Sequence, residues 1–236
     1  MGGCSGSCEG LAVSIPETAW WVRMLASDNP QLPSLWLMQM WLNLGWAVVT
    51  AWLGCALVQR LSPRKPWIVG VTLACALWVW LPGPYASSYW LGLAFQLPSI
   101  SAVLLCGVLL WTLAGGARCQ TPAVHSAQWH PAERGCAVAG VALSACLALD
   151  TFALFPVPLY AWGFSGVAVV VALGLSLLPW VASRNGRCGV MLWIAPLAIA
   201  LFVVLRLPTG NLWDALLDPW LGVGLAVYLW RHRSCR

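Results

Sequence analysis

The chain has 236 residues, of which 61% are hydrophobic and 8% are charged, and its formal net charge is +5. An ordinary soluble domain carries about 25% charged residues, so this composition excludes a water-soluble globular fold. It predicts an all-α, polytopic integral membrane helical bundle, because helices satisfy their own backbone polar groups in lipid. The basic residues lie in short connections between apolar runs, which favours the lipid bilayer as a partner and argues against nucleic acid.

Residues 1–33 are expected to form an outer-side segment. Within it, residues 15–27 have the pattern of a short amphipathic helix lying in the membrane interface, with Trp20 and Trp21 on the lipid side. Cys4 and Cys8 lie on the same side, and spacing alone leaves open whether they form a disulfide. The first 30 residues lack the basic and apolar regions of a cleavable signal peptide.

The gaps between charged residues predict seven membrane-spanning helices, because about 20 apolar residues cross the hydrocarbon core. The predicted spans are 34–58, 66–82, 88–114, 135–156, 164–183, 188–206 and 212–230. Proline pairs at 82–84 and 156–158 break two helical hairpins. Residues 34–230 therefore form the predicted transmembrane domain, and residues 231–236 form a basic tail.

The distribution of Lys and Arg predicts the orientation of these spans. Of the 12 basic residues, only Arg23 and Arg206 fall on the side opposite to the other ten. The side with more Lys and Arg is cytoplasmic, so we expect an outside N-terminus and a cytoplasmic C-terminus. The 18 Trp residues fit this tryptophan-rich arrangement, since many lie near predicted helix ends. Abundant Arg, Ala, Gly and Trp favour a bacterial origin, and hence the cell inner membrane.

Scattered polar residues converge on the predicted outer side of the bundle. Asp150 lies well within a predicted span, Arg206 ends another, and Asp214 and Asp218 begin the last. The functional hypothesis is that these four residues form one cluster at the outer mouth and act as a substrate or ion site. The aromatic residues expected around it are Tyr85, Tyr160 and Trp213. Structural pairing is the interpretation favoured over this role, with Arg206 neutralising an aspartate and Asn211 capping the last helix.

Small residues recur at every fourth position of the predicted span 135–156. Cys136, Gly140, Ser144 and Ala148 form a stripe on one helix face, which lets a second helix approach closely. The second helix belongs either to this chain or to a membrane-protein partner that binds the Gly140, Ser144 and Ala148 face.

Two amide side chains give the first predicted span a polar face. Gln39 and Asn43 are four residues apart and therefore lie on the same side of the helix. We expect them to form hydrogen bonds to a neighbouring helix, and a ligand-binding role is the alternative.

The tetrapeptide Gly163–Gly166 resembles the Gly-x-Ser-Gly element of rhomboid-type intramembrane proteases. The resemblance covers four residues and implies Ser165 as the nucleophile, with a histidine base on a neighbouring helix. All three histidines (His125, His130 and His232) fall on the predicted cytoplasmic side, so this topology forms no dyad. The sequence therefore predicts no catalytic residue, no metal site and no cofactor.

Three classes of function remain open. The favoured one is a non-catalytic subunit of a cell-envelope membrane assembly, because no catalytic constellation is present. The second is a transporter for a small molecule, ion or lipid that uses the Asp/Arg cluster. The third is a membrane enzyme acting on a lipid-linked substrate. The substrate, the oligomeric state and the presence of a central cavity are left undetermined at this stage.

Overall fold

A computed structural model describes residues 32–61, 65–113, 131–154, 157–182 and 190–233. These residues are helical or connect helices, and none forms a β-strand, which confirms the predicted all-α class. The expected interfacial helix at 15–27 and the cysteines Cys4 and Cys8 lie outside the described residues.

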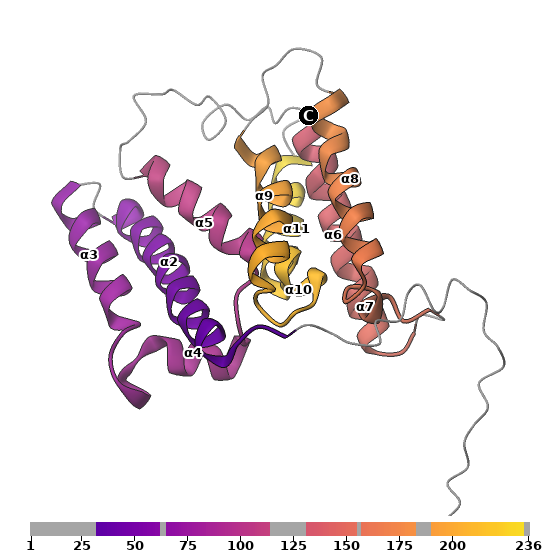
Figure 1. Ribbon diagram of the computed structural model, residues 1–236. Coiled ribbons are helices and arrows are strands. Elements are labelled where there is room, and N and C mark those ends of the chain that lie inside the picture. The colour runs from indigo at the N-terminus through magenta and orange to yellow at the C-terminus, as the bar shows by residue number, and fades with distance from the viewer. Residues whose placement is uncertain (1–31, 62–64, 114–130, 155–156, 183–189, 234–236) are drawn as a thin grey trace, which may run out of the picture.

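The longer helices alternate in direction along the chain, whereas α4 lies across the lower end of α2 and α3 (Figure 1). The first group comprises α2 (Leu35–Leu61), α3 (Lys65–Trp78), the 3₁₀ turn η1 (Gly83–Tyr85), α4 (Ser87–Phe95) and α5 (Ile100–Leu113). The second group comprises α6 (Pro131–Thr151), α7 (Leu159–Trp162), α8 (Gly166–Ala182), η2 (Val190–Trp193), α9 (Ile194–Leu205), α10 (Leu212–Leu216) and α11 (Pro219–Arg233). The predicted break at Pro82–Pro84 is confirmed, and Gly83 supplies the positive φ of 59° that this turn requires.

Two helices that the apolar pattern predicts as continuous are broken. The span predicted at 88–114 separates into α4 and α5 at Gln96, which has a φ of 61° and lies two residues before Pro98. The span predicted at 212–230 separates into α10 and α11 at Leu217, which has an extended backbone. In both cases a proline lacks the N–H that a continuous helix needs and disfavours helical geometry at the preceding residue.

Length and composition identify two candidate membrane spans among the described residues, Leu35–Leu61 and Ala132–Thr151. The other apolar helices are shorter: Trp67–Trp78, Ile100–Leu113, Gly166–Val181 and Met191–Leu205. Two candidates are fewer than the seven predicted spans, partly because the breaks shorten the helices that contain them.

The two groups of helices meet along α5, which contacts both α9 and α10 (Figure 1). Ile100 of α5, Phe202 of α9 and Leu212 of α10 are fully buried in one core cluster at this junction. Elsewhere large apolar side chains face outward, and Val170 and Val181 of α8 are each 72% exposed. An exposed surface of this kind is typical of a helix that contacts lipid.

The small-residue stripe on α6 packs against α11 of the same chain. An added Cβ on Gly140 would lie 3.0 Å from Leu225 Cδ1, and one on Gly222 would lie 2.7 Å from Ser144 Oγ. Both distances show that the helices approach closely only because these residues are small. The neighbour of the Gly140 and Ser144 face is therefore α11, whereas Ala148 remains exposed.

This close contact predicts opposite effects for two alanine substitutions on α11. Gly222→Ala should lower the free energy of unfolding by about 1–3 kcal/mol, because the new methyl group overlaps Ser144. Gly224→Ala is the matched control, since its Cβ meets no atom within 4 Å, and it should leave stability unchanged or raise it by up to about 1 kcal/mol. Thermal unfolding of both variants in the same detergent measures the difference.

The double variant Ser144→Gly with Gly222→Ala should recover part of the lost stability, because it removes the atoms that the new methyl group meets. Equal stability of the two single alanine variants would show that α6 and α11 do not pack as described.

Candidate functional site

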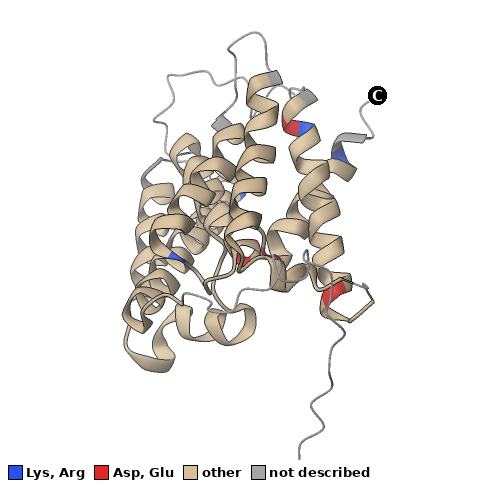
Figure 2. Ribbon diagram, turned by 45° about the vertical axis from the view of Figure 1, so that its right-hand side comes forward, with Lys and Arg blue, Asp and Glu red and all other residues tan. Residues whose placement is uncertain are grey.

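The described acidic residues gather at one end of the bundle, except for one that lies beside a basic residue at the opposite end (Figure 2). The acidic end contains the breaks between α4 and α5 and between α10 and α11, together with the short helix α7. This is the end at which the sequence predicts the polar cluster.

Asp214 and Tyr160 form the first contact of this region. Tyr160 Oη, on α7, donates a hydrogen bond of 2.8 Å to Asp214 Oδ2, and Thr209 Oγ1 donates to the same oxygen. Asp214 lies in the first turn of α10, where a negative charge complements the helix dipole. Burial, followed by the Asp214 carboxylate, raises the pKa of the Tyr160 phenol above its ordinary value of 10.0. The phenol therefore stays protonated and acts as the donor.

Asp150 binds the same tyrosine through the backbone. Its Oδ2 accepts a 2.7 Å hydrogen bond from the N–H of Tyr160, ten residues further along the chain. This contact closes the connection between α6 and α7. A carboxylate near the C-terminal end of a helix is disfavoured by the dipole, and a backbone donor compensates for that position.

Asn211 and Trp213 hold α10 against α7. Asn211 Oδ1 accepts from the N–H of Trp213 at 2.9 Å, which confirms the predicted cap. The Asn211 amide also donates to the Tyr160 carbonyl at 3.0 Å, and Trp213 Nε1 donates to the Leu159 carbonyl at 2.9 Å. Gly163 allows this close approach, since an added Cβ there would collide with Asn211 Oδ1.

Asp218 lies at a separate position and links the two helix breaks. Its Oδ2 accepts from the Ser99 N–H at 3.1 Å and from Ser99 Oγ at 2.8 Å, while its Oδ1 accepts from the Leu221 N–H at 2.6 Å. Ser99 in turn caps α5, because its Oγ accepts from the Ala102 N–H at 3.1 Å. The N-termini of α5 and α11 therefore converge on one carboxylate, which their dipoles stabilise.

Arg206 and Tyr85 do not join the aspartates. Arg206 ends α9 with a left-handed φ of 56°, and its guanidinium lies 5.4 Å from the centre of the Phe202 ring. No carboxylate of a described residue forms an ion pair with it. Tyr85 is 74% exposed in η1, where its carbonyl accepts a hydrogen bond from Trp78 Nε1. The structure thus brings together Asp150, Asp214 and two of the predicted aromatic residues, Tyr160 and Trp213.

The remaining sequence motifs have structural roles. Ser165 is buried, and its Oγ accepts from the Ala168 N–H at 3.1 Å, so it caps α8 as a serine before a helix commonly does. Within the described ranges no group of three or more His, Cys, Asp or Glu side chains could hold a metal ion. Sequence reasoning missed Ser99 and Thr209, although a hydroxyl residue directly after a proline and shortly before a helix is a recognisable capping signal.

No known protein family, curated protein or solved structure matches the chain. The functional argument therefore depends on the geometry of the acidic end. Each of its three aspartates accepts hydrogen bonds from backbone or hydroxyl donors of the same chain. Asp218 uses both of its carboxylate oxygens in these contacts, whereas Asp150 and Asp214 use Oδ2 alone.

The shared carboxylate predicts that Asp218→Asn destabilises the protein. An amide offers one oxygen to three donors and turns its NH₂ group toward at least one of them, which should cost about 1–3 kcal/mol of unfolding free energy. Ser99→Ala should also destabilise, and the double variant should lose less than the sum of the two losses.

Chemical unfolding in detergent measures these losses. Ser176→Ala is the control, because Ser176 Oγ donates only to the Leu173 carbonyl of its own helix, and it should change stability by less than about 0.5 kcal/mol. Additive losses at Ser99 and Asp218 would disprove the link between α5 and α11.

The Tyr160 contact predicts an alkaline titration. The tyrosinate absorbance of the wild type minus that of Tyr160→Phe should show one phenol ionising above pH 10.0. Because the folded state favours the neutral phenol, its stabilising contribution is complete below the unfolded pKa and is lost as pH rises through the folded pKa. A difference curve centred at or below pH 10.0 would contradict the hydrogen bond to Asp214.

Proposed function

We propose that this chain is a multi-pass protein of the bacterial inner membrane with seven spans, an outside N-terminus and a cytoplasmic C-terminus. The alternating directions of the helices support this arrangement (Figure 1). Arg60 at the end of α2, Arg134 at the start of α6 and Arg231 near the end of α11 would then all face the cytoplasm. The pairs α4/α5 and α10/α11 each count as one span.

A broken span in lipid needs internal partners for its freed backbone groups, and two carbonyls at the break between α4 and α5 have such partners. Trp46 Nε1 donates to the Gln96 carbonyl and Trp41 Nε1 to the Pro98 carbonyl, both at 3.0 Å. At 1.5 Å per residue, Asp218 lies about 20 Å from Arg231 along α11, within a hydrocarbon core of about 30 Å. A carboxylate at that depth needs internal donors, and Ser99 provides two.

We further propose that the protein is a non-catalytic subunit of a cell-envelope membrane assembly. The observation that carries this proposal is the engagement of Asp150, Asp214 and Asp218 by donors of their own chain. Carboxylates used in this way brace helix ends and connections. Because α11 covers Gly140 and Ser144, a partner on the small-residue stripe would have to bind at its exposed end, around Ala148.

A transporter is the second candidate, and the meeting of two broken helices at Asp218 favours it. Discontinuous helices often direct their N-termini at a transported anion. Here Asp218 itself occupies the position of such an anion between α5 and α11. Transport would require Asp218 to leave Ser99 when substrate arrives.

Paired reporter fusions test the topology. Alkaline phosphatase should be inactive and a green fluorescent reporter bright when fused after Arg236, and the reverse should hold after Pro84 or Val157. An active phosphatase after Arg236 would invert the arrangement and overturn the proposed orientation.

Co-purification tests the subunit role. The full chain, extracted in mild detergent, should retain a partner at fixed stoichiometry, and Asp150→Asn and Asp214→Asn should keep that partner whenever they fold. A chain that purifies alone, with substrate-dependent stabilisation that Asp218→Asn abolishes, would replace the subunit role by transport.

A further inference from the structure

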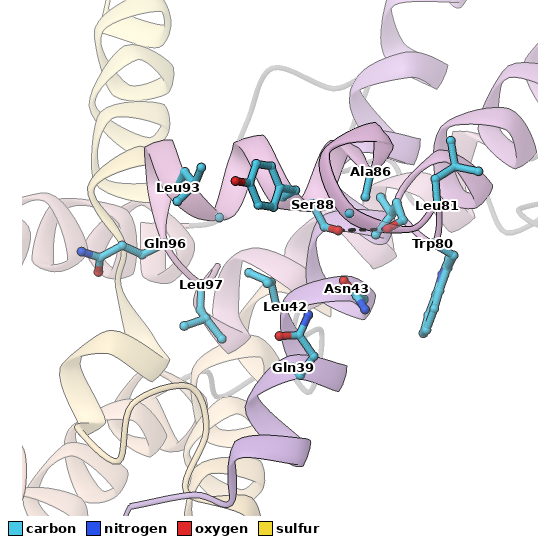
Figure 3. A pocket seen from close by; sticks show the side chains of 14 residues that line it. Gln39, Leu42, Asn43, Trp80, Leu81, Ala86, Ser88, Leu93, Gln96 and Leu97 are labelled. Carbon is cyan, nitrogen blue, oxygen red and sulfur yellow. Dashed lines mark hydrogen bonds between the residues drawn. The ribbon is translucent and has the colours of Figure 1, made fainter.

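A cavity of about 520 Å³ opens between α2, η1 and α4, away from the aspartates (Figure 3). Its lining residues are Gln39, Leu42, Asn43, Val79, Trp80, Leu81, Gly83, Ala86, Ser88, Tyr89, Gly92, Leu93, Gln96 and Leu97. The volume is within the range of small-molecule sites, which are mostly apolar with a few placed polar groups.

Two amides of this cavity have no partner within the described part of the chain. Gln39 and Asn43 lie side by side on α2 (Figure 3) and make no hydrogen bond to another described residue. The expectation that they bond to a neighbouring helix is therefore not met. Ser88, by contrast, already donates to the Val79 carbonyl at 2.9 Å, whereas the two α2 amides keep their donors and acceptors for a ligand.

Gln96 lines the cavity from a strained backbone position, with its amide directed away from Gln39 and Asn43 (Figure 3). Gln96 has a φ of 61° and a ψ of −145°, which residues other than glycine rarely adopt. The Trp46 indole holds this conformation by donating to the Gln96 carbonyl at 3.0 Å. Strain of this kind persists where the surrounding structure enforces it, and it concentrates at binding sites.

The lining specifies an uncharged ligand with hydroxyl groups. None of the 14 lining residues is Asp, Glu, Lys, Arg or His, so neither an anion nor a cation finds a counter-charge. An amide both donates and accepts, and a hydroxyl group does the same. The leucines and the half-exposed Trp80 suit an apolar chain attached to such a head.

We propose that this cavity binds the headgroup of an uncharged, hydroxyl-bearing membrane lipid of the diacylglycerol class. The lipid source, rather than a soluble polyol, follows from the exposed indoles of Trp36 and Trp90 on the same helices, α2 and α4, since such rings mark the membrane interface. The proposal rests on the membrane placement in the proposed function and is independent of the subunit role.

Photolabelling in lipid nanodiscs tests the site. The full chain is placed in phosphatidylcholine discs with a trace of dioleoylglycerol that carries a photoreactive group, and the labelled peptides are mapped. Label should fall on α2 and α4, and unlabelled dioleoylglycerol should displace it. Phosphatidylglycerol and free glycerol should not, because the first is charged and the second lacks the apolar chain.

The variant Gln39→Ala with Asn43→Ala should reduce this labelling about tenfold, the effect of losing two neutral hydrogen bonds. Gln59→Ala is the matched control, since it removes an amide from the same helix outside the cavity, and it should label as the wild type does. If the double variant does not fold, Gln39→Ala alone serves, because Gln39 is exposed and its truncation leaves the core intact.

Three outcomes would overturn the lipid site: unchanged labelling of a folded double variant, equal competition by phosphatidylglycerol, or label mapped away from α2 and α4. Competition by free glycerol would overturn the lipid source and indicate a soluble polyol. If the reporter fusions still give the proposed orientation, any of these results would leave the topology intact, so the two failures are distinguishable.

Discussion

The Asp218 carboxylate is the contact on which the arrangement of the two helix groups depends. It accepts both donors of Ser99 and the N–H of Leu221, so one anion satisfies the N-terminal ends of two helices from distant parts of the chain. The fully buried Ile100 packs directly after this cap. A hydrophobic interface alone would allow α5 to slide along its neighbours. A directional hydrogen-bonded contact at its N-terminus instead fixes the position of α5 along its own axis.

A second set of polar contacts braces the acidic end. Tyr160 is held through its backbone N–H by Asp150, through its hydroxyl by Asp214 and through its carbonyl by Asn211. These contacts tie the short helix α7 to both α6 and α10. In a low-dielectric setting such satisfied networks are rigid, and each unpaired member would be costly. The polar contacts of the acidic end therefore hold helices together, and this structural role is the basis for the proposed non-catalytic function.

The amide-lined cavity beside α2 and α4 differs from the acidic end in how its polar groups are partnered. Gln39 and Asn43 lack hydrogen-bond partners among the described residues, whereas each aspartate of the acidic end accepts at least one hydrogen bond. Amides without a protein partner beside an open volume are the observation on which the ligand proposal rests. The molecule thus separates a structural polar region from a candidate binding region, and the second is uncharged.

Local patterns were enough to predict the all-α class, the turn at Pro82–Pro84 and the Asn211 cap, because each depends on residues within one or two turns of helix. They also indicated that Asp150 and Asp214 would lie at one end. The pairing of Ser99 with Asp218 joins residues 119 positions apart, so only the tertiary structure decided it. The same holds for the helix breaks, since an apolar run with one proline is compatible with either a kink or a new helix. Which of these forms depends on donors and acceptors that other helices supply.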